Sequence, residues 1–263
     1  MQRRQLFQFA KNGLLFTASL SLASLAETIT QSGNAQIRSP QKPVATNLTL
    51  QWLGHMSFLS SGNGVKILTH PFKPGGCTAG LTMPQLSPNL ALVSSRLLDE
   101  GYLADLSPSV RVLQEPGAYN IAGIGFQGIR MAHDRLEGRR FGNNIAWLWT
   151  QGNSRILHLG GAAAPLSPEQ RILMGRPNIL ILPVGGGAKG YNAQEAKQVM
   201  DSLNPQIAIP CHYRTDKAAN SCELEPLDQF LSLVQDRQIN RLSGNTFSLA
   251  SLPKEPSVVV FKL

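Results

Sequence analysis

Residues that could do chemistry follow two predicted strands in the segment 178–216. Residues 179–182 (ILIL) have the short, uninterrupted aliphatic pattern of a strand buried on both faces. A Gly-Gly-Gly loop (185–187) follows, where the backbone can approach a ligand closely. A second apolar strand, 206–210, ends just before His212. Ligands usually bind at the carboxyl ends of strands in open α/β sheets, so His212 is a candidate site residue.

A helix is predicted to connect these two strands. Asn192 and Glu195 form a capping box, and apolar residues recur at helical spacing from Ala196 to Leu203. The Asn204-Pro205 pair ends the helix. Because a strand–helix–strand unit pairs its strands in parallel with a right-handed crossover, we expect the two strands to be parallel neighbours.

The remainder of the chain is predicted to be rich in strands. Alternating hydrophobicity and turn residues indicate strands at 48–53, 56–60, 65–69, 90–93, 110–113, 119–121, 124–131, 145–150, 155–159 and 258–261. Short helices are expected after Ser167 and over 227–234. This order along the chain, with hairpins first and then strands alternating with helices, favours a fold of two sheets covered by helices.

Several segments together resemble the metallo-β-lactamase superfamily. The segments LQWLGHMSFL (50–59) and ILTHP (67–71) are similar to its opening. Residues 179–213 are similar to the ending of the branch that includes ascorbate-6-phosphate lactonase and related metal-dependent hydrolases, and His133 and HLGG (158–161) fall where that branch has an isolated histidine and an HxGD turn. The resemblance implies an α/β protein, a four-layer αββα sandwich with its site along one edge.

The departures from this family pattern fall on the positions that hold metal in the family. The resemblance sets the HxHxDH ligand turn on Ser95, Leu97, Asp99 and Glu100, where only the aspartate matches. It sets the metal-bridging aspartate on Gly161, which has no side chain. A two-metal hydrolytic centre is therefore not expected.

The resemblance leaves four candidate metal ligands: Asp99, Glu100, His133 and His212. Carboxylate and imidazole groups ligate zinc and manganese, so one such ion is conceivable, although no cofactor is firmly predicted. His55 is a candidate substrate-binding residue beside the site, and no catalytic residue is assigned. Structural roles are open too: His133 and His212 could be hydrogen bonded in place, and Asp99 could cap a helix.

Three functions remain open at this point. The favoured one is a relative of metal-dependent hydrolases that has lost most two-metal activity and keeps a cleft for a small molecule or a protein. The alternative is a single-metal hydrolase, with zinc or manganese, acting on a lactone or phosphoester. The third is hydrolysis without metal through Cys77 or a histidine.

The N-terminus has the features of an export signal. Arg3-Arg4 precede an apolar run, 13–26, which is short for a membrane span. We therefore expect an export signal at 1–26, a linker at 27–47 and the metallo-β-lactamase-like domain at 48–263. The paired arginines favour the twin-arginine route to the periplasm or an equivalent compartment, with cleavage after Ala26 or Ala35 and no membrane span afterwards. An uncleaved anchor and a basic tail are the alternatives.

Charge and cysteine content narrow the choice of partners only slightly. The net charge is +8, but the lysines and arginines form no dense cluster, so a nucleic-acid partner is not expected. The oligomeric state stays open.

Three cysteines (Cys77, Cys211 and Cys222) allow at most one disulfide within the chain. A Cys211–Cys222 bridge is one option, and Cys211 as a small apolar residue at a strand end is another.

Overall fold

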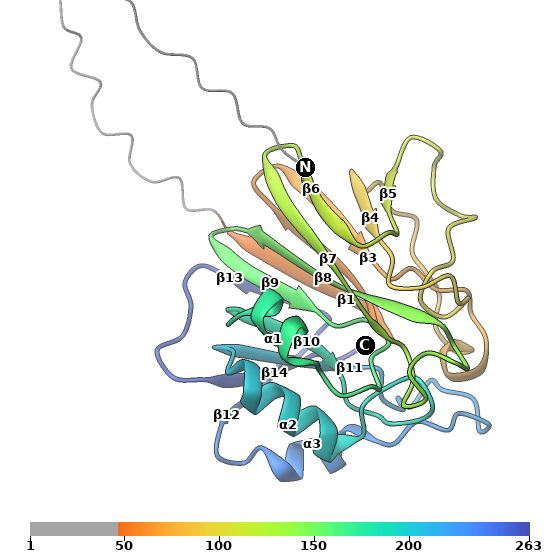
Figure 1. Ribbon diagram of the computed structural model, residues 1–263, viewed down its shortest axis with the longest axis vertical. Coiled ribbons are helices and arrows are strands. Elements are labelled where there is room, and N and C mark those ends of the chain that lie inside the picture. Colours follow the sequence, from red (N-terminus) through yellow and green to blue (C-terminus); the bar gives the residue numbers. More distant parts are fainter. Residues whose placement is uncertain (1–46) are drawn as a thin grey trace, which may run out of the picture. The chain divides into compact units, whose positions relative to one another are not determined.

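Two β-sheets face each other in the computed structural model, which describes residues 47–263 (Figure 1). The six-stranded sheet has the order β13 (Thr246–Leu249), β1 (Leu48–Gly54), β2 (Ser57–Gly62), β3 (Val65–Thr69), β4 (Leu90–Leu92) and β5 (Arg111–Leu113). The expected export signal and the linker lie outside the described residues, apart from Asn47.

The eight-stranded sheet carries the central segment. Its order is β12 (Gln238–Arg241), β14 (Ser257–Val260), β11 (Ile207–Cys211), β10 (Ile179–Pro183), β9 (Ser154–His158), β8 (Asn143–Gln151), β7 (Ile124–Ala132) and β6 (Gly117–Ile121). Strands β9 to β12 and β14 pair in parallel, whereas β6 to β9 form an antiparallel meander. Strands β10 and β11 are parallel neighbours, as predicted.

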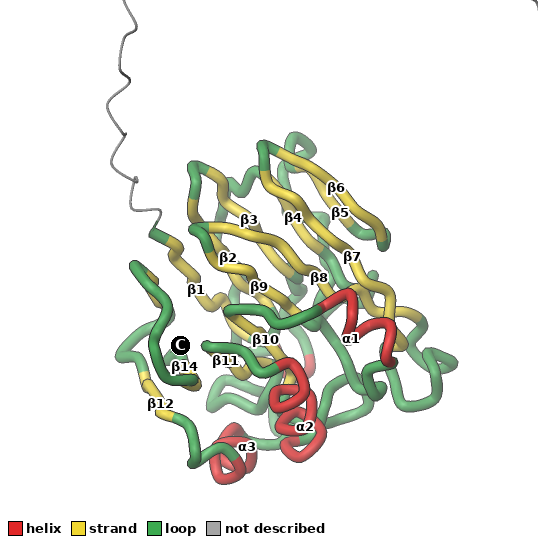
Figure 2. Tube along the Cα trace, turned by 60° about the vertical axis from the view of Figure 1, so that its left-hand side comes forward, coloured by secondary structure: helices red, strands yellow, loops and turns green. Residues whose placement is uncertain are grey.

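Three α-helices follow β9 in the described part of the chain: α1 (Pro168–Met174), α2 (Ala193–Leu203) and α3 (Leu227–Leu233). The predicted capping boxes form, with the Ser167 hydroxyl accepting from Gln170 N–H and the Asn192 side chain accepting from Glu195 N–H. Helix α1 contacts β7, and α2 contacts β10 and α3, so the helices belong to the eight-stranded sheet (Figure 2).

The mixed α/β architecture with two sheets is confirmed, and its helices are unevenly distributed. Between β3 and β5 the chain forms long loops with one short 3-10 helix, η1 (Gly76–Thr78). Strands β12 and β13 were not predicted. Among the described residues, no helix is long and apolar enough to span a membrane.

The core joins both sheets through large side chains. Trp52 and Phe58 of the six-stranded sheet belong to the same buried cluster as Trp147 and Trp149 of the eight-stranded sheet. Trp147 Nε1–H donates to Val93 O at 3.0 Å, which ties the end of β4 to the opposite sheet. This bond fixes the loop that carries Asp99 and Glu100 relative to β8.

Candidate functional site

All five histidines of the chain are buried at the carboxyl ends of strands. They are His55 after β1, His70 after β3, His133 after β7, His158 at the end of β9 and His212 after β11. His55, His70 and His212 also have positive φ angles of 51°, 47° and 52°. Strained backbone of this kind in residues other than glycine clusters at functional sites.

Glu100 and His133 form a contact that is fully enclosed by protein, called the enclosed pair below. His133 Nε2 donates to Glu100 Oε1, and both side chains have no exposed surface. Ser95 Oγ donates to the same oxygen at 2.7 Å, and Ser94 Oγ donates to Oε2 at 2.9 Å. Protein groups therefore satisfy both carboxylate oxygens.

The charge of the enclosed pair is balanced internally. Burial by itself would raise the pKa of Glu100, but the charge of His133 and its hydrogen bond outweigh that effect and lower the pKa. Glu100 is thus held as a carboxylate although it is out of contact with water.

Gly161 is the position that leaves room for the enclosed pair. A Cβ atom at this residue would lie 2.6 Å from Glu100 Oε2 and 2.6 Å from His133 Nε2. Any larger residue would have to displace one of these two groups. The space in which the family resemblance places a bridging aspartate is therefore filled by the carboxylate of Glu100.

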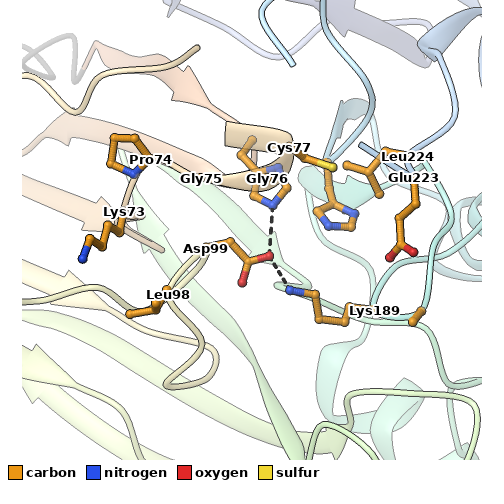
Figure 3. A pocket seen from close by; sticks show the side chains of 13 residues that line it. Lys73, Pro74, Gly75, Gly76, Cys77, Leu98, Asp99, Lys189, Glu223 and Leu224 are labelled. Atoms are coloured by element: carbon orange, nitrogen blue, oxygen red, sulfur yellow. Dashed lines mark hydrogen bonds and ion pairs between the residues drawn. The ribbon is translucent and has the colours of Figure 1, made fainter. Parts of the chain in front are cut away.

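Asp99, the residue before Glu100, forms a second ion pair at the floor of an open cavity. Its Oδ2 accepts from Lys189 Nζ and lies 3.7 Å from His55 Nε2 (Figure 3). The Asp99 and Lys189 side chains, called the cavity pair below, are 27% and 18% exposed. The cavity has a volume of about 380 Å³ and is lined by His55, Lys73, Pro74, Gly75, Gly76, Cys77, Leu98, Asp99, Ala188, Lys189, His212, Glu223 and Leu224.

His212 shares this cavity and packs edge-on against His55, with ring centroids 4.5 Å apart. A Cβ atom on Gly190 would lie 2.6 Å from His212 Nδ1, so this nitrogen faces the glycine backbone. Neither His212 Nδ1 nor His55 Nε2 has a hydrogen-bond partner. Burial, followed by the charges of His55 and Lys189, lowers the pKa of His212 well below 6.5, so its imidazole is neutral.

Asp99 is charged, in contrast to the neutral His212. Burial would raise the pKa of Asp99, but the nearby His55 imidazole and the Lys189 ammonium together hold that pKa well below its usual range. Asp99 is therefore ionised, and Lys189 is its counter-ion.

Arg135, which follows β7, holds the loop that carries Lys189. Arg135 donates to Gly187 O and Gly190 O, each at 3.0 Å, on either side of Lys189. It also forms an ion pair with Glu195. The sequence patterns did not indicate Lys189 or Arg135, although Lys189 lies two residues after the Gly-Gly-Gly loop at which a ligand was expected to approach.

Asp134 organises the loop that precedes β8. Its carboxylate accepts four backbone N–H groups: those of Leu136 at 2.8 Å, Gly138 at 3.2 Å, Arg140 at 3.1 Å and Phe141 at 2.8 Å. This loop places the Phe141 ring 5.9 Å from Lys189 Nζ and 6.1 Å from the ring of His133.

His158 and His70 have structural roles. His158 Nε2 donates to Met56 O at 2.9 Å, and its Nδ1 accepts from Gly160 N–H at 3.1 Å. These two bonds define a neutral ring. His70 Nδ1 accepts from Ser94 N–H at 3.1 Å, which orients one of the serines of the enclosed pair.

A disulfide joins Cys77 and Cys222, 145 residues apart in sequence, and Cys77 lines the cavity. The Cys211–Cys222 bridge considered from the sequence is wrong, because Cys211 is a free, buried thiol. Hydrolysis through a Cys77 thiolate is wrong too, because the sulfur of Cys77 is bonded to Cys222. The disulfide connects the loop after β3 to the loop after β11 at the rim of the cavity.

The structure separates the four predicted ligands into two environments. Glu100 and His133 are paired with each other, whereas Asp99 and His212 line the cavity. Asp99 caps no helix, because it lies within a turn (98–100) that no helix follows directly. Within residues 47–263, no three His, Cys, Asp or Glu side chains are grouped so that they could hold a metal ion. The carboxylates of both sets are already bonded by protein groups, Glu100 by His133 and two serine hydroxyls and Asp99 by Lys189, so the donor sets do not fit a metal pair.

Comparison with known proteins gives the family. A family model described as a beta-lactamase superfamily domain matches residues 49–212. A metal-dependent hydrolase of the UPF0173 family from Thermoplasma acidophilum is 28% identical over 194 residues, which are 64% of this chain and 84% of that protein.

Solved structures agree with this match. A protein from Thermotoga maritima, described as a Zn-dependent hydrolase of the metallo-β-lactamase superfamily, is 30% identical with a TM-score of 0.66, over 81% of this chain and 98% of that one. An isothiocyanate hydrolase from Delia radicum gut bacteria is 14% identical with a TM-score of 0.59, over 77% and 100%, and so shares the fold. The chain belongs to the metallo-β-lactamase superfamily.

Proposed function

We propose that this protein is a metal-independent binding member of the superfamily, which lacks two-metal hydrolase activity and keeps a cavity for a small molecule. The observation that carries the proposal is the enclosed pair. Glu100 and His133 satisfy each other, with two serine hydroxyls, in the space next to Gly161 where a bridging carboxylate would have to stand.

The chemistry of the remaining side chains supports the same proposal. Metal-dependent hydrolases rely on a bound cation to lower the pKa of water from 15.7 toward ~7. Here the Ser95 hydroxyl donates a hydrogen bond to Glu100, and Leu97 has an alkyl side chain that cannot ligate. The family pattern has histidines at these two positions. Without their imidazoles and without a bridging carboxylate, we expect affinity for two ions to be lost.

The cavity supports a binding role. Its volume of about 380 Å³ falls in the range of roughly 300–1,000 Å³ typical of small-molecule sites. Apolar groups (Leu98 and Leu224) lie beside polar ones (His55 and Lys189) in its lining. In Figure 3, Lys73 and Glu223 lie at opposite sides of this cavity. The combination suits a small, partly polar molecule.

Metal content tests the proposal directly. The protein would be purified from zinc- and manganese-supplemented medium, its metal per chain counted by elemental analysis, and lactone and phosphodiester substrates screened. We expect near-zero metal and no chelator-sensitive turnover. Two equivalents of zinc with turnover that a chelator abolishes would refute the proposal.

Restoring the family ligands gives the converse test. Gly161→Asp, Ser95→His, Leu97→His and Glu100→His together should recover metal binding. Gly161→Asp alone is the matched control, and we expect it to destabilise the protein without binding metal, because its Cβ would meet Glu100 and His133 at 2.6 Å.

A single-metal hydrolase is the second candidate. It is favoured by the presence of His55, Asp99 and His212 in the lining of one cavity, although among the described residues no three such side chains are grouped so that they could hold an ion. One equivalent of metal in the wild type that disappears in His212→Ala would support this candidate over the first.

We also propose that the chain is exported. The Cys77–Cys222 disulfide supports this, because structural disulfides form and persist mainly in oxidising compartments. Replacing Arg3 and Arg4 with lysine should leave the precursor in the cytoplasm if the twin-arginine route is used. Unchanged export would rule that route out, and a precursor lacking residues 1–26 serves as the non-exported control.

A further inference from the structure

We infer that the protein has a second ligand site, for a small organic anion that carries a carboxylate or phosphate group on an aromatic ring. The site is a second cavity of about 370 Å³, lined mainly by the segments 213–217, 226–228 and 261–263. It shares no lining residue with the cavity of the proposed function, although His212 lines that cavity and Tyr213, the next residue, lines the second one. The inference therefore goes beyond the proposed function and does not depend on it.

An excess of positive side chains in the lining carries the first step. Four cations and two carboxylates line the second cavity: Arg214, Lys217, Arg241 and Lys262, with Asp216 and Asp228. Arg241 lies 3.7 Å from Asp228, and both of these side chains are largely exposed. Within residues 47–263, Arg214, Lys217 and Lys262 form no ion pair. Because guanidinium groups match carboxylate and phosphate groups in geometry, this lining suits an anion.

Aromatic side chains supply the second step. Trp52, Tyr213 and Phe261 line the second cavity. The ring centroid of Trp52 lies 5.4 Å from that of Tyr213 and 6.4 Å from that of Phe261. These three rings are buried, so they form a fixed apolar wall, whereas the four cations are exposed. Since aromatic rings pack favourably against one another in offset or edge-to-face contact, a flat ring with its anionic group toward the cations fits this lining.

Two hydroxyl groups can complete the contacts of such a ligand. Thr215 lines the second cavity, and its Oγ1 is buried without a hydrogen-bond partner. Buried polar atoms without partners are uncommon in folded proteins, and an anion in the cavity would supply one. Burial raises the pKa of Tyr213, and the charge of Arg241 offsets this only in part. The phenol therefore keeps its proton and can donate a hydrogen bond.

The first test measures the binding of four small probes by ligand-observed NMR titration at low salt, where charge interactions are least screened. Phenyl phosphate and benzoate carry both a ring and a charge, benzamide carries the ring alone, and inorganic phosphate carries the charge alone. We expect phenyl phosphate and benzoate to bind at least about tenfold more tightly than the other two. Inorganic phosphate bound as tightly as phenyl phosphate would show an adventitious ion only and overturn the inference, as would no binding of either aromatic anion.

Variants assign the bound anion to the second cavity. Arg214→Ala and Arg241→Ala should each weaken phenyl phosphate binding about tenfold, and Thr215→Val, which keeps the volume and the charge, about threefold. Arg111→Ala, at an exposed arginine of β5, is the matched control for lost charge and should change nothing. Lys73→Ala removes a cation from the other cavity and should also change nothing.

Circular dichroism and the melting temperature show that each variant is folded. Binding weakened by Lys73→Ala but not by Arg214→Ala or Arg241→Ala would place the anion in the other cavity and overturn the inference. Equal weakening by Arg111→Ala and Arg241→Ala would overturn it too, because net charge alone would then explain the binding. The metal content of the wild type, which tests the proposed function, is measured separately, so either conclusion can fail while the other stands.

Discussion

Asp99 and Glu100 are consecutive carboxylates in one turn, yet they lie in opposite environments. Glu100 has no exposed surface and is balanced by His133, whereas Asp99 is 27% exposed at the cavity floor and is balanced by Lys189. In both cases the partner of the carboxylate is a protein side chain. The enclosed pair should therefore act mainly on folding stability, and the cavity pair mainly on binding.

The largest expected effect is at the enclosed pair. Glu100→Ala leaves His133 and two serine hydroxyls without their partner in a buried site, and we expect the free energy of unfolding to fall by about 3–5 kcal/mol. Urea denaturation measures this. Glu100→Gln, which keeps the volume and one acceptor oxygen, should lose less. A loss under about 1 kcal/mol for Glu100→Ala would mean that the pair contributes little.

The Cys77–Cys222 disulfide beside the cavity tests whether the two regions contribute independently to stability. Replacing Cys77 and Cys222 with serine should lower the free energy of unfolding by about 2–4 kcal/mol, because the unfolded chain loses a long-range constraint. The cost of Glu100→Ala should be unchanged within about 0.5 kcal/mol in this background if the two regions are independent. A double-mutant cycle in urea measures the coupling, and a larger coupling would contradict their separation.

The pH dependence of folding stability tests the buried environment of His158, whose pKa is affected by the charge of Glu100 in the enclosed pair. Burial lowers the pKa of His158 to about 4, although its bond to Met56 O and the charge of Glu100 raise it. The unfolded chain, with a pKa near ~6.5, takes up a proton that the folded protein does not, so stability is lost as pH falls. Between pH 7 and 5 this loss is about 2 kcal/mol for His158.

His158→Gln removes that contribution and isolates it from other groups. Urea denaturation of wild type and variant at pH 7 and pH 5 gives two differences, and the wild type should lose about 2 kcal/mol more than the variant. Equal losses would show that His158 titrates normally in the folded protein.

The smallest effect is expected at the cavity pair. Asp99→Asn breaks an ion pair that is partly exposed to solvent, so the free energy of unfolding should change by less than about 1 kcal/mol. The matched variant is Glu100→Gln, the same carboxylate-to-amide change one residue later. If Asp99→Asn destabilises the protein as much as Glu100→Gln in urea, the contrast between the two environments fails.

Much of the fold could be predicted because its signals are local. The aliphatic strand 179–182, the Asn192 capping box and the Asn204-Pro205 stop define β10, α2 and β11 without knowledge of distant contacts. Strands β12 and β13 were missed because they are short and half exposed. Their pairing with β14 and β1 depends on parts of the chain far away in sequence.

The candidate site was predictable in its position but not in its pairing. Strand-end histidines and the carboxylates of one turn could be located from the sequence. The contact between Glu100 and His133 depends on the space left by Gly161, and the role of Lys189 on Arg135, which follows another strand. The Cys77–Cys222 bridge likewise depends on two loops meeting across 145 residues. Such contacts follow from tertiary structure and leave no local pattern.

The carboxylate of Asp134 has a further consequence, which concerns the exchange of amide hydrogens with solvent. Four amides of its loop donate to this one side chain, although the loop lies outside the strands and α-helices. Exchange at these amides requires the carboxylate contacts to open, so the loop should exchange as one cooperative unit and more slowly than its lack of regular structure suggests. The segment carries Phe141, whose ring lies near Lys189 and near His133, and would thus be a rigid border to both ion pairs.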